Sequence, residues 1–427
     1  MTDFQLLEIA AREIRRTPRG LPTGMPYGLL GPEDSLSYTR EGFLAISGLA
    51  RSLQQNRAEL RRGAKFEPLR KVVANSAIRL FENRIEQGPT ANLEDLAQLK
   101  GTVKDWFATV SVTRTHIVPC AVIPNRAPSF NIGPVRFAHA TDFDAGDLGV
   151  KGHAGFETGW ATIERQLNER AASWVAVVEV EGCESARSSE IADTAVDIAL
   201  GAVQSIVGAD EGRFMSRTTS RANPPYRGTV AVSNHEISTN LQYSDGRLLL
   251  PDALESILGS AEELVGSFGT RVNAFLRGDS GVQALEQAWC DGAYWFHEGL
   301  AEPMDTVAVA KLETALENLF SAGSSRQSRA RIRQALEIMR SERTEKDGET
   351  ERVEFAGRVV EARSRVLHGT RSTTRDDPGV DRESVEAVVC EMLSRYSLLL
   401  DAYSSQGGIN DKDNVKSFFA WVEQVRS

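Results

Sequence analysis

Residues 361–370 read EARSRVLHGT, and this stretch determines the fold that we expect for the C-terminal part of the chain. Apolar residues recur at helical spacing before it and within it: Phe355, Val359, Ala362 and Val366. This spacing predicts a helix over 353–368 with one buried face. Gly369 follows directly, as glycine commonly does after a helix end. The stretch therefore lies at the C-terminus of an amphipathic helix.

Further helical patterns surround this one from residue 251 to the end. Apolar stripes predict helices over 253–276, 282–296, 308–319, 326–340 and 383–403. The polar, charged segment 341–350 is expected to be a solvent loop. Several helices of 12 to 20 residues with short connections are typical of a bundle. We therefore expect an all-α C-terminal domain over 251–427.

The pattern is mixed in the middle of the chain, over 109–250. Strands are predicted at 109–123, 130–137 and 174–180, where β-branched or continuous apolar residues gather. Helices are predicted at 159–171 and 190–207. Short hairpin-like strands follow at 229–232, 237–243 and 247–250, with Ser-Asp-Gly as a turn. This composition predicts an α/β middle domain.

The N-terminal region, 1–108, is predicted to be helical. A short helix at 4–15 precedes a loop rich in proline and glycine, and helical spacing continues from residue 36 to 107. The expected fold class is thus α+β and multidomain: a helical N-terminal region, an α/β middle domain and a C-terminal helical bundle.

Composition excludes several classes of protein. With 41% hydrophobic and 25% charged residues, the chain is typical of globular proteins. No apolar run approaches the ~20 residues that span a bilayer. The N-terminus carries acids and no export signal, so we expect a cytoplasmic protein without a membrane partner. The four cysteines are far apart in sequence and indicate neither a disulfide framework nor a zinc site.

The net charge of −10 is unevenly distributed. Residues 40–84 hold ten Lys and Arg against four Glu, and residues 323–375 hold thirteen Lys and Arg against eight Asp and Glu. Two basic surfaces on an acidic protein are one interpretation. Solvated helix faces with ordinary charge alternation are the other.

The opening stretch also carries the main candidates for chemistry, Arg363 and His368. Imidazole takes or gives a proton near pH 7, and a fixed guanidinium holds a phosphate and stabilises developing negative charge. These groups suit RNA cleavage by its own 2′-hydroxyl without a metal. Five residues at ~100° each separate the two side chains by roughly 140° around a straight helix. Either the long Arg363 side chain reaches around the helix, or two copies of the helix meet and complete the site across a homodimer, which is the arrangement that we favour. A surface cap and a solvated charge are the alternative interpretation.

The C-terminal bundle resembles the Apea-like group of HEPN domains. The resemblance covers about 279–403 and rests on ARSRVLHG after a helix bearing KLETALENLF. It implies an Arg-x4–6-His motif, here Arg363 and His368, in a metal-independent endoribonuclease that needs no cofactor and is assembled by dimerisation. Many members act in phage defence, toxin–antitoxin systems or other stress responses. Many HEPN nucleases have Asn, Asp or His directly after the arginine, where this chain has Ser364.

Other residues are assigned lesser roles. Ser364 and Glu361 are expected to support the site, and five arginines are expected to hold RNA phosphates: Arg326, Arg329, Arg333, Arg365 and Arg371. His297 is interpreted as a helix-end residue, because no second histidine follows at metal-binding spacing. The activating signal or regulatory partner is not indicated by the sequence. The alternative function is a non-catalytic dimerisation or RNA-binding module with a ligand-sensing middle domain.

Overall fold

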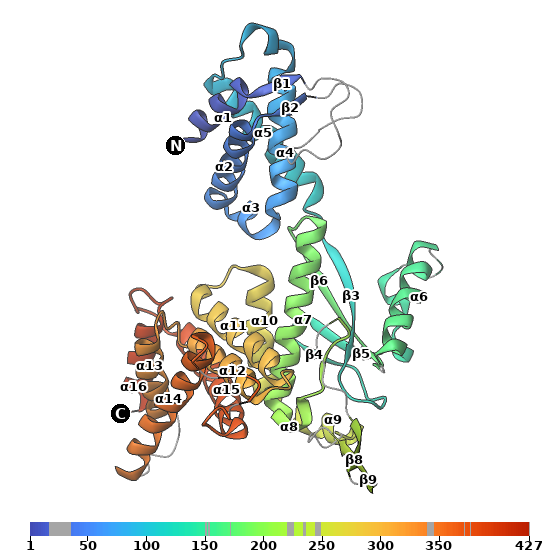
Figure 1. Ribbon diagram of the computed structural model, residues 1–427, viewed down its shortest axis with the longest axis vertical. Coiled ribbons are helices and arrows are strands. Elements are labelled where there is room, and N and C mark those ends of the chain that lie inside the picture. The colour runs from blue at the N-terminus through green and yellow to red at the C-terminus, as the bar shows by residue number, and fades with distance from the viewer. Residues whose placement is uncertain are drawn as a thin grey trace. The chain divides into compact units, whose positions relative to one another are not determined.

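The chain is described from a computed structural model (Figure 1), which covers every residue except 17–35, 150–151, 153, 171, 220–225, 234–235, 244–248, 340–345, 371, 376 and 427. The expected Pro/Gly-rich loop, the Ser-Asp-Gly turn, and Arg371 lie outside the described residues. The chain is mostly helical and carries a small five-stranded sheet, in agreement with an α+β fold.

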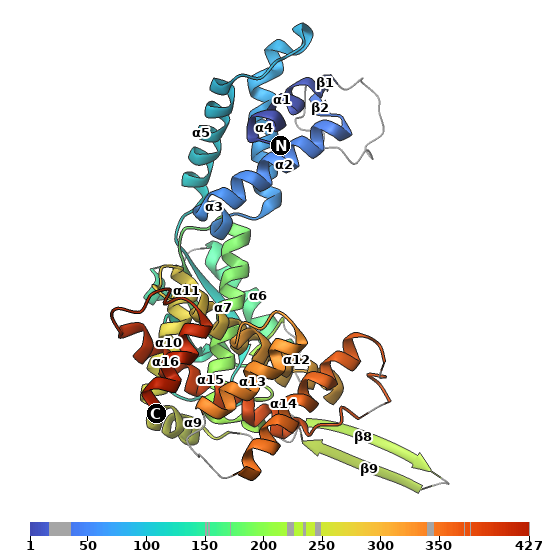
Figure 2. The same cartoon turned by 90° about the vertical axis from the view of Figure 1, so that its left-hand side faces the viewer.

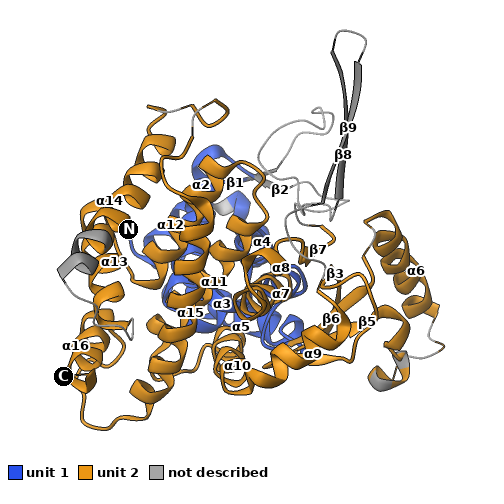
Figure 3. Cartoon of the chain, turned by 90° about the horizontal axis from the view of Figure 1, so that it is seen from below, with its two compact units in different colours: residues 1–114, 180–191 blue, residues 115–179, 192–427 orange. Residues whose placement is uncertain are grey.

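Two compact units are present, coloured separately in Figure 3: residues 1–114 with 180–191, and residues 115–179 with 192–427. The three-region division expected from sequence, with boundaries at 108/109 and 250/251, stays a prediction.

The first unit is built mainly from helices. Its elements are α1 Asp3–Arg12, β1 Ile14–Arg16, β2 Leu36–Tyr38, α2 Arg40–Asn56, α3 Ala58–Gly63, α4 Phe66–Phe81, the 3-10 helix η1 Glu82–Gln87, α5 Leu93–Val110 and the start of α7 Ser185–Val207. Fully buried side chains such as Leu7, Leu49, Leu69 and Phe81 form a single core. The helical N-terminal prediction is confirmed, except that residues 14–16 and 36–38 pair as short antiparallel strands.

The second unit contains a sheet with strand order β4-β5-β6-β3-β7. The strands are β3 Arg114–Ala121, β4 Phe130–Ile132, β5 Val135–His139, β6 Trp174–Val180 and β7 Ser216–Arg217. β6 has the predicted bounds, and its side chains are mostly buried, including Trp174, Val175 and Ala176 in succession, as a continuous apolar run predicts. The predicted strand over 109–123 begins later, since α5 continues to Val110.

The β4–β5 hairpin lies against helix α10, Glu262–Arg277. Gly133 at the turn has φ +55°, and a Cβ placed there would be 2.3 Å from the carbonyl oxygen of Gly269. A Cβ on Gly269 would in turn come within 2.7 Å of the Gly133 nitrogen. Both positions therefore require glycine, since either side chain would separate the hairpin from the helix.

The remaining elements of the second unit are mostly helices, many of which appear in Figure 2. They are the 3-10 helices η2 Ala140–Asp142 and η3 Ala145–Leu148, the hairpin β8 Tyr226–Ser233 with β9 Glu236–Tyr243, and the helices α6 Ala154–Glu169, α7 after residue 191, α8 Ala209–Gly212, α9 Pro251–Ser260, α11 Gln283–Leu300, α12 Asp305–Leu319, α13 Ser325–Met339, α14 Lys346–Leu367, α15 Arg382–Ser405 and α16 Val415–Arg426. Fully buried aromatic and aliphatic residues from α11, α12 and α15, including Trp289, Leu316 and Tyr396, form the core of the bundle.

Three expectations for the helical part were wrong in detail. The helix predicted over 253–276 is two helices, because the backbone leaves helical geometry at Ala261 (φ −105°, ψ 25°). Part of the loop predicted over 341–350 is helical, since α14 begins at Lys346. A further helix, α16, was not predicted, and its Phe418, Phe419 and Val422 are buried.

Candidate functional site

Helix α14 ends directly at the candidate histidine. The backbone N–H of Thr370 donates to the Arg365 carbonyl (3.0 Å) and that of Gly369 donates to Val366 (3.2 Å), while Gly369 has φ +65°. This is a Schellman motif, which places His368 at the C-cap position. His368 is exposed and lies at the C-terminal, negative end of the helix dipole.

Arg363 lies about one and a half turns before His368 on α14 and has a different environment. Its Nε lies 3.1 Å from Oε2 of Glu313, and its Nη2 lies 2.7 Å from Oε2 of Glu317. Both carboxylates belong to α12, and they are four residues apart, so they lie on one face of that helix. The Arg363 side chain keeps 21% of its surface exposed.

Glu313 is the more buried of the two carboxylates and has no exposed side-chain surface. Burial raises its pKa to about 7, against the opposing effects of a hydrogen bond from the Ser328 hydroxyl (2.7 Å) and the charge of Arg363. The 3.1 Å approach of the Arg363 Nε lacks hydrogen-bond geometry, so the contact is an ion pair. Near neutral pH, Glu313 and Glu317 together thus carry less than two full negative charges beside the guanidinium of Arg363.

A single chain does not bring Arg363 and His368 into contact. Arg363 is directed to α12, and the His368 side chain makes no hydrogen bond or ion pair within the described residues. The roughly 140° separation expected from helical geometry is consistent with this arrangement. Any joint action of the two groups therefore requires a second chain or a rearrangement.

The other residues assigned to the site have simple surroundings. Ser364 is half-buried, and its carbonyl accepts from the His368 N–H (3.0 Å). Glu361 and Arg365 form an exposed ion pair with each other at i, i+4. Such a pair contributes only ~0.3–0.5 kcal/mol, so Arg365 can exchange Glu361 for a phosphate at small cost.

Helix α13 carries the predicted basic row. Arg326, Arg329 and Arg333 are all exposed. Arg331 on the same helix is instead directed to the C-terminus of α12, where it donates to the carbonyls of Phe320 and Ser321. The exposed row is therefore separate from the arginine that fixes α13 against α12.

Sequence reasoning missed the partners of Arg363. Glu313 and Glu317 are in the segment KLETALENLF, which was used for the resemblance but not for the site. A signal was present, because Glu313 lies among the apolar positions of a helix whose Leu312, Leu316 and Leu319 are fully buried. A charged residue there needs a partner of opposite charge.

A second polar cluster missed by sequence reasoning surrounds His297 on α11. This histidine is fully buried, and its Nδ1 lies 2.9 Å from Oε1 of Gln204 on α7. The amide nitrogen of Gln204 donates to two backbone carbonyls, so its oxygen accepts and Nδ1 carries the proton. Burial lowers the pKa of His297, although Asp197 lies 3.6 Å from Nε2.

Asp197 does not hold a charged histidine, because it already has another partner. Arg217 donates to both of its oxygens, at 2.7 and 2.8 Å. His297 thus remains neutral beside a satisfied ion pair, and its interpretation as a helix-end residue was incomplete: its surroundings are those of a core histidine. The cluster stabilises the contact between α7, α11 and β7.

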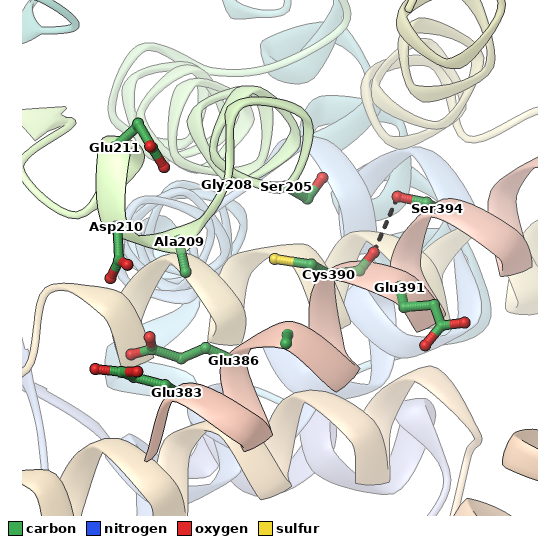
Figure 4. A pocket seen from close by; sticks show the side chains of 11 residues that line it. Ser205, Gly208, Ala209, Asp210, Glu211, Glu383, Glu386, Cys390, Glu391 and Ser394 are labelled. Atoms are coloured by element: carbon green, nitrogen blue, oxygen red, sulfur yellow. Dashed lines mark hydrogen bonds between the residues drawn. The ribbon is translucent and has the colours of Figure 1, made fainter. Parts of the chain in front are cut away.

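An acidic pocket of about 570 Å³ lies between the end of α7 with α8 and helix α15 (Figure 4). Asp210, Glu383 and Glu386 gather at one end of it, and Cys390 and Ser394 lie towards the other. Glu386 is neutralised by Arg213, which donates to both of its oxygens at 2.8 Å. The remaining carboxylates repel phosphate, so this pocket is not an extension of an RNA site.

No group of three or more His, Cys, Asp or Glu residues within the described ranges is arranged to hold a metal ion. In the same part of the chain, none of the helices has the length and apolar character needed to cross a membrane. No family model, curated protein or solved structure matches the chain.

Proposed function

We propose that the chain is a metal-independent endoribonuclease of the HEPN type, acting in the cytoplasm as a defence or stress effector. Arg363 and His368 are its catalytic residues, and two chains complete the site. The observation that supports the proposal best is the exposed imidazole of His368 at the C-cap of α14, in the helix that also holds Arg363 at a defined position.

The reaction uses the substrate's own nucleophile. The RNA 2′-oxygen attacks the adjacent phosphorus, which forms a 2′,3′-cyclic phosphate, and the bond to the 5′-oxygen breaks. Water accepts the 2′-hydroxyl proton, and the His368 imidazole of the chain opposite the phosphate-binding Arg363 donates a proton to the leaving 5′-oxygen. The C-cap position of His368 at the end of α14 leaves its imidazole exposed for this role.

Arg363 supplies the phosphate contact in this proposal. Its Nε and Nη2 face Glu313 and Glu317, which fix the direction of the guanidinium, while the exposed 21% of the side chain is open to a non-bridging phosphate oxygen. Charge-assisted hydrogen bonds of this kind are stronger than neutral ones and are most useful when the donor is already oriented. The exposed row of Arg326, Arg329 and Arg333 then supplies further phosphate contacts.

The same ion pairs favour a second candidate. A guanidinium that is engaged by two carboxylates of its own chain also acts as a structural clamp between α12 and α14. In that case the bundle is a non-catalytic dimerisation or RNA-binding module, and the middle region senses a ligand. Under the first candidate the protein cleaves RNA and needs His368 to do so. Under the second it does not cleave RNA.

The test is RNA cleavage by the purified full-length protein in excess EDTA. His368→Ala is expected to abolish cleavage, and Arg358→Ala, at an exposed position on the same helix that pairs with Glu354, is the matched control. RNA binding without cleavage by the native protein favours the second candidate. Equal cleavage by the native protein and the His368 variant removes the proposed active site.

A further inference from the structure

The first unit contains a basic pocket that the proposed nuclease site does not use. Its volume is about 380 Å³. It is lined by residues from the end of α2, from the α3–α4 junction and from the start of α7: Gln54, Gln55, Arg61, Lys65, Phe66 and Arg187. Three of these side chains are cationic and none is acidic. The pocket lies entirely within residues 1–114 and 180–191.

Two contacts fix the wall of this pocket. The amide nitrogen of Gln54 donates to the Ala64 carbonyl (2.8 Å), which holds the α3–α4 junction against α2. The Nε of Arg187 donates to the Arg62 carbonyl (3.0 Å), which holds the start of α7 against the same junction. Arg187 is therefore held by a backbone contact in addition to its ion pair with Glu190.

The cations outnumber the carboxylates beside them. Lys65 (2.6 Å) and Arg187 (3.3 Å) share one carboxylate, Glu190, whose side chain is 48% exposed. Arg61 is exposed and has no ion pair or side-chain hydrogen bond within the described residues. Exposed pairs of this kind contribute little to stability, so an arriving anion displaces Glu190 at small cost.

The start of α4 adds to the positive potential. Lys65 occupies its N-cap position and provides no side-chain cap, where Ser, Thr, Asp or Asn is preferred. The acidic residue of the first turn, Glu67, is engaged by Arg70. A basic residue farther along this unit, Arg84, is matched by a carboxylate of its own, Asp95. The pocket, in contrast, carries three cations beside one shared carboxylate.

We propose that this pocket binds a terminal phosphate, that is, a phosphate monoester. Arginine and lysine hold phosphate oxygens by charge-assisted hydrogen bonds, and a dianionic phosphate matches the excess of two positive charges left by three cations and Glu190. The volume lies within the range of small-ligand sites. Phe66 adds an aromatic ring to the wall, with the Arg51 guanidinium 5.2 Å from its centroid. A free nucleotide and the 5′-phosphate end of an RNA share this chemistry.

Binding of defined probes to the full-length protein tests the proposal by isothermal titration calorimetry. Adenosine 5′-monophosphate is compared with adenosine, and a short RNA bearing a 5′-phosphate is compared with the same RNA bearing a 5′-hydroxyl. We expect one phosphorylated member of these pairs to bind at least tenfold more tightly than its unphosphorylated counterpart. The pair that shows the difference identifies the source of the phosphate.

Arg61→Gln is expected to weaken that binding about tenfold, the loss typical of one charge-assisted contact. Arg79→Gln is the matched control, because Arg79 is exposed on the last turn of α4, away from the pocket. His368→Ala is expected to bind the phosphorylated probe as the native protein does, so failure of the nuclease proposal leaves this one intact. Absence of binding by both phosphorylated probes, equal binding within both pairs, or an unaffected Arg61→Gln variant overturns the proposal.

Discussion

The Nε of Arg363 lies 3.1 Å from Oε2 of Glu313, a carboxylate with no exposed surface. The arginine that the sequence marks for catalysis is therefore also the charge partner of a buried acid. A substitution at this position changes stability as well as chemistry, and experiments on the site have to separate the two effects.

Arg363→Ala is expected to destabilise the protein by about 2 kcal/mol. Removal of one member of a buried ion pair leaves the other charge uncompensated, and the loss is reduced here because Arg363 is partly exposed. Urea unfolding followed by circular dichroism measures the change. The double variant Arg363→Ala/Glu313→Gln is expected to recover most of the loss, because a neutral amide still accepts from Ser328. Additive effects of the two substitutions would show that the pair does not interact.

The raised pKa of Glu313 predicts a pH dependence of stability. The native state holds this proton up to about pH 7, whereas the unfolded state releases it near the usual value of 4.5. The contribution of Glu313 to stability is thus greatest below pH 4.5 and falls as the pH rises to about 7. Glu313→Gln removes this loss, so its stability relative to the native protein is expected to improve between pH 4.5 and 8 by on the order of 3 kcal/mol. If the stability difference between Glu313→Gln and the native protein does not change with pH, Glu313 does not titrate in this range.

His297 is expected to be neutral, with its proton on Nδ1, at pH 6.5 and above. Burial lowers its pKa, and Gln204 accepts from Nδ1 at 2.9 Å. Because the folded pKa lies below the unfolded one, this group costs stability as the pH falls through about 6.5. The imidazole nitrogen shifts in ¹⁵N NMR report both the tautomer and the charge. A signal for His297 that titrates at or above pH 6.5 contradicts the expected burial effect.

The sequence predicted those parts of the fold that depend on local pattern. The buried strand Trp174–Val180 has the predicted bounds, because a short continuous apolar run has few alternatives. The break at Ala261 was missed because no proline marks it. The additional turns of α14 from Lys346 were missed because the segment is polar. In both places the surrounding fold outweighs local preference.

The candidate site was predictable only in part, for a similar reason. The C-cap position of His368 follows from Gly369, which is local information. The pairing of Arg363 with Glu313 joins residues fifty positions apart and depends on how α14 packs on α12. Helical spacing identifies which residues share a face but not which other helix covers that face.

The basic row on α13 gives a prediction for RNA affinity. Arg326→Gln, Arg329→Gln and Arg333→Gln are each expected to weaken RNA binding, and each lost phosphate contact reduces the slope of log K against log salt by ~1. Fluorescence anisotropy with a labelled RNA at several salt concentrations measures both quantities. Arg358→Gln on α14 serves as the exposed control. If the slope of log K against log salt is unchanged in all three variants, these arginines do not contact RNA phosphates.

Mixing of two inactive variants tests whether the site spans two chains. Arg363→Ala, combined with Glu313→Gln to preserve stability, leaves a dimer with two histidines and no site arginine. His368→Ala leaves two arginines and no histidine. After the two variants are unfolded together and refolded, a mixed dimer holds one Arg363 and one His368, contributed by different chains. We expect cleavage well above that of either variant alone. No chain in the mixture holds both residues, so a site formed within one chain is absent from every dimer. If the mixture is as inactive as its components, Arg363 and His368 do not meet across an interface. A native chain that remains monomeric in light scattering leads to the same conclusion, because His368 and Arg363 then never lie on facing surfaces.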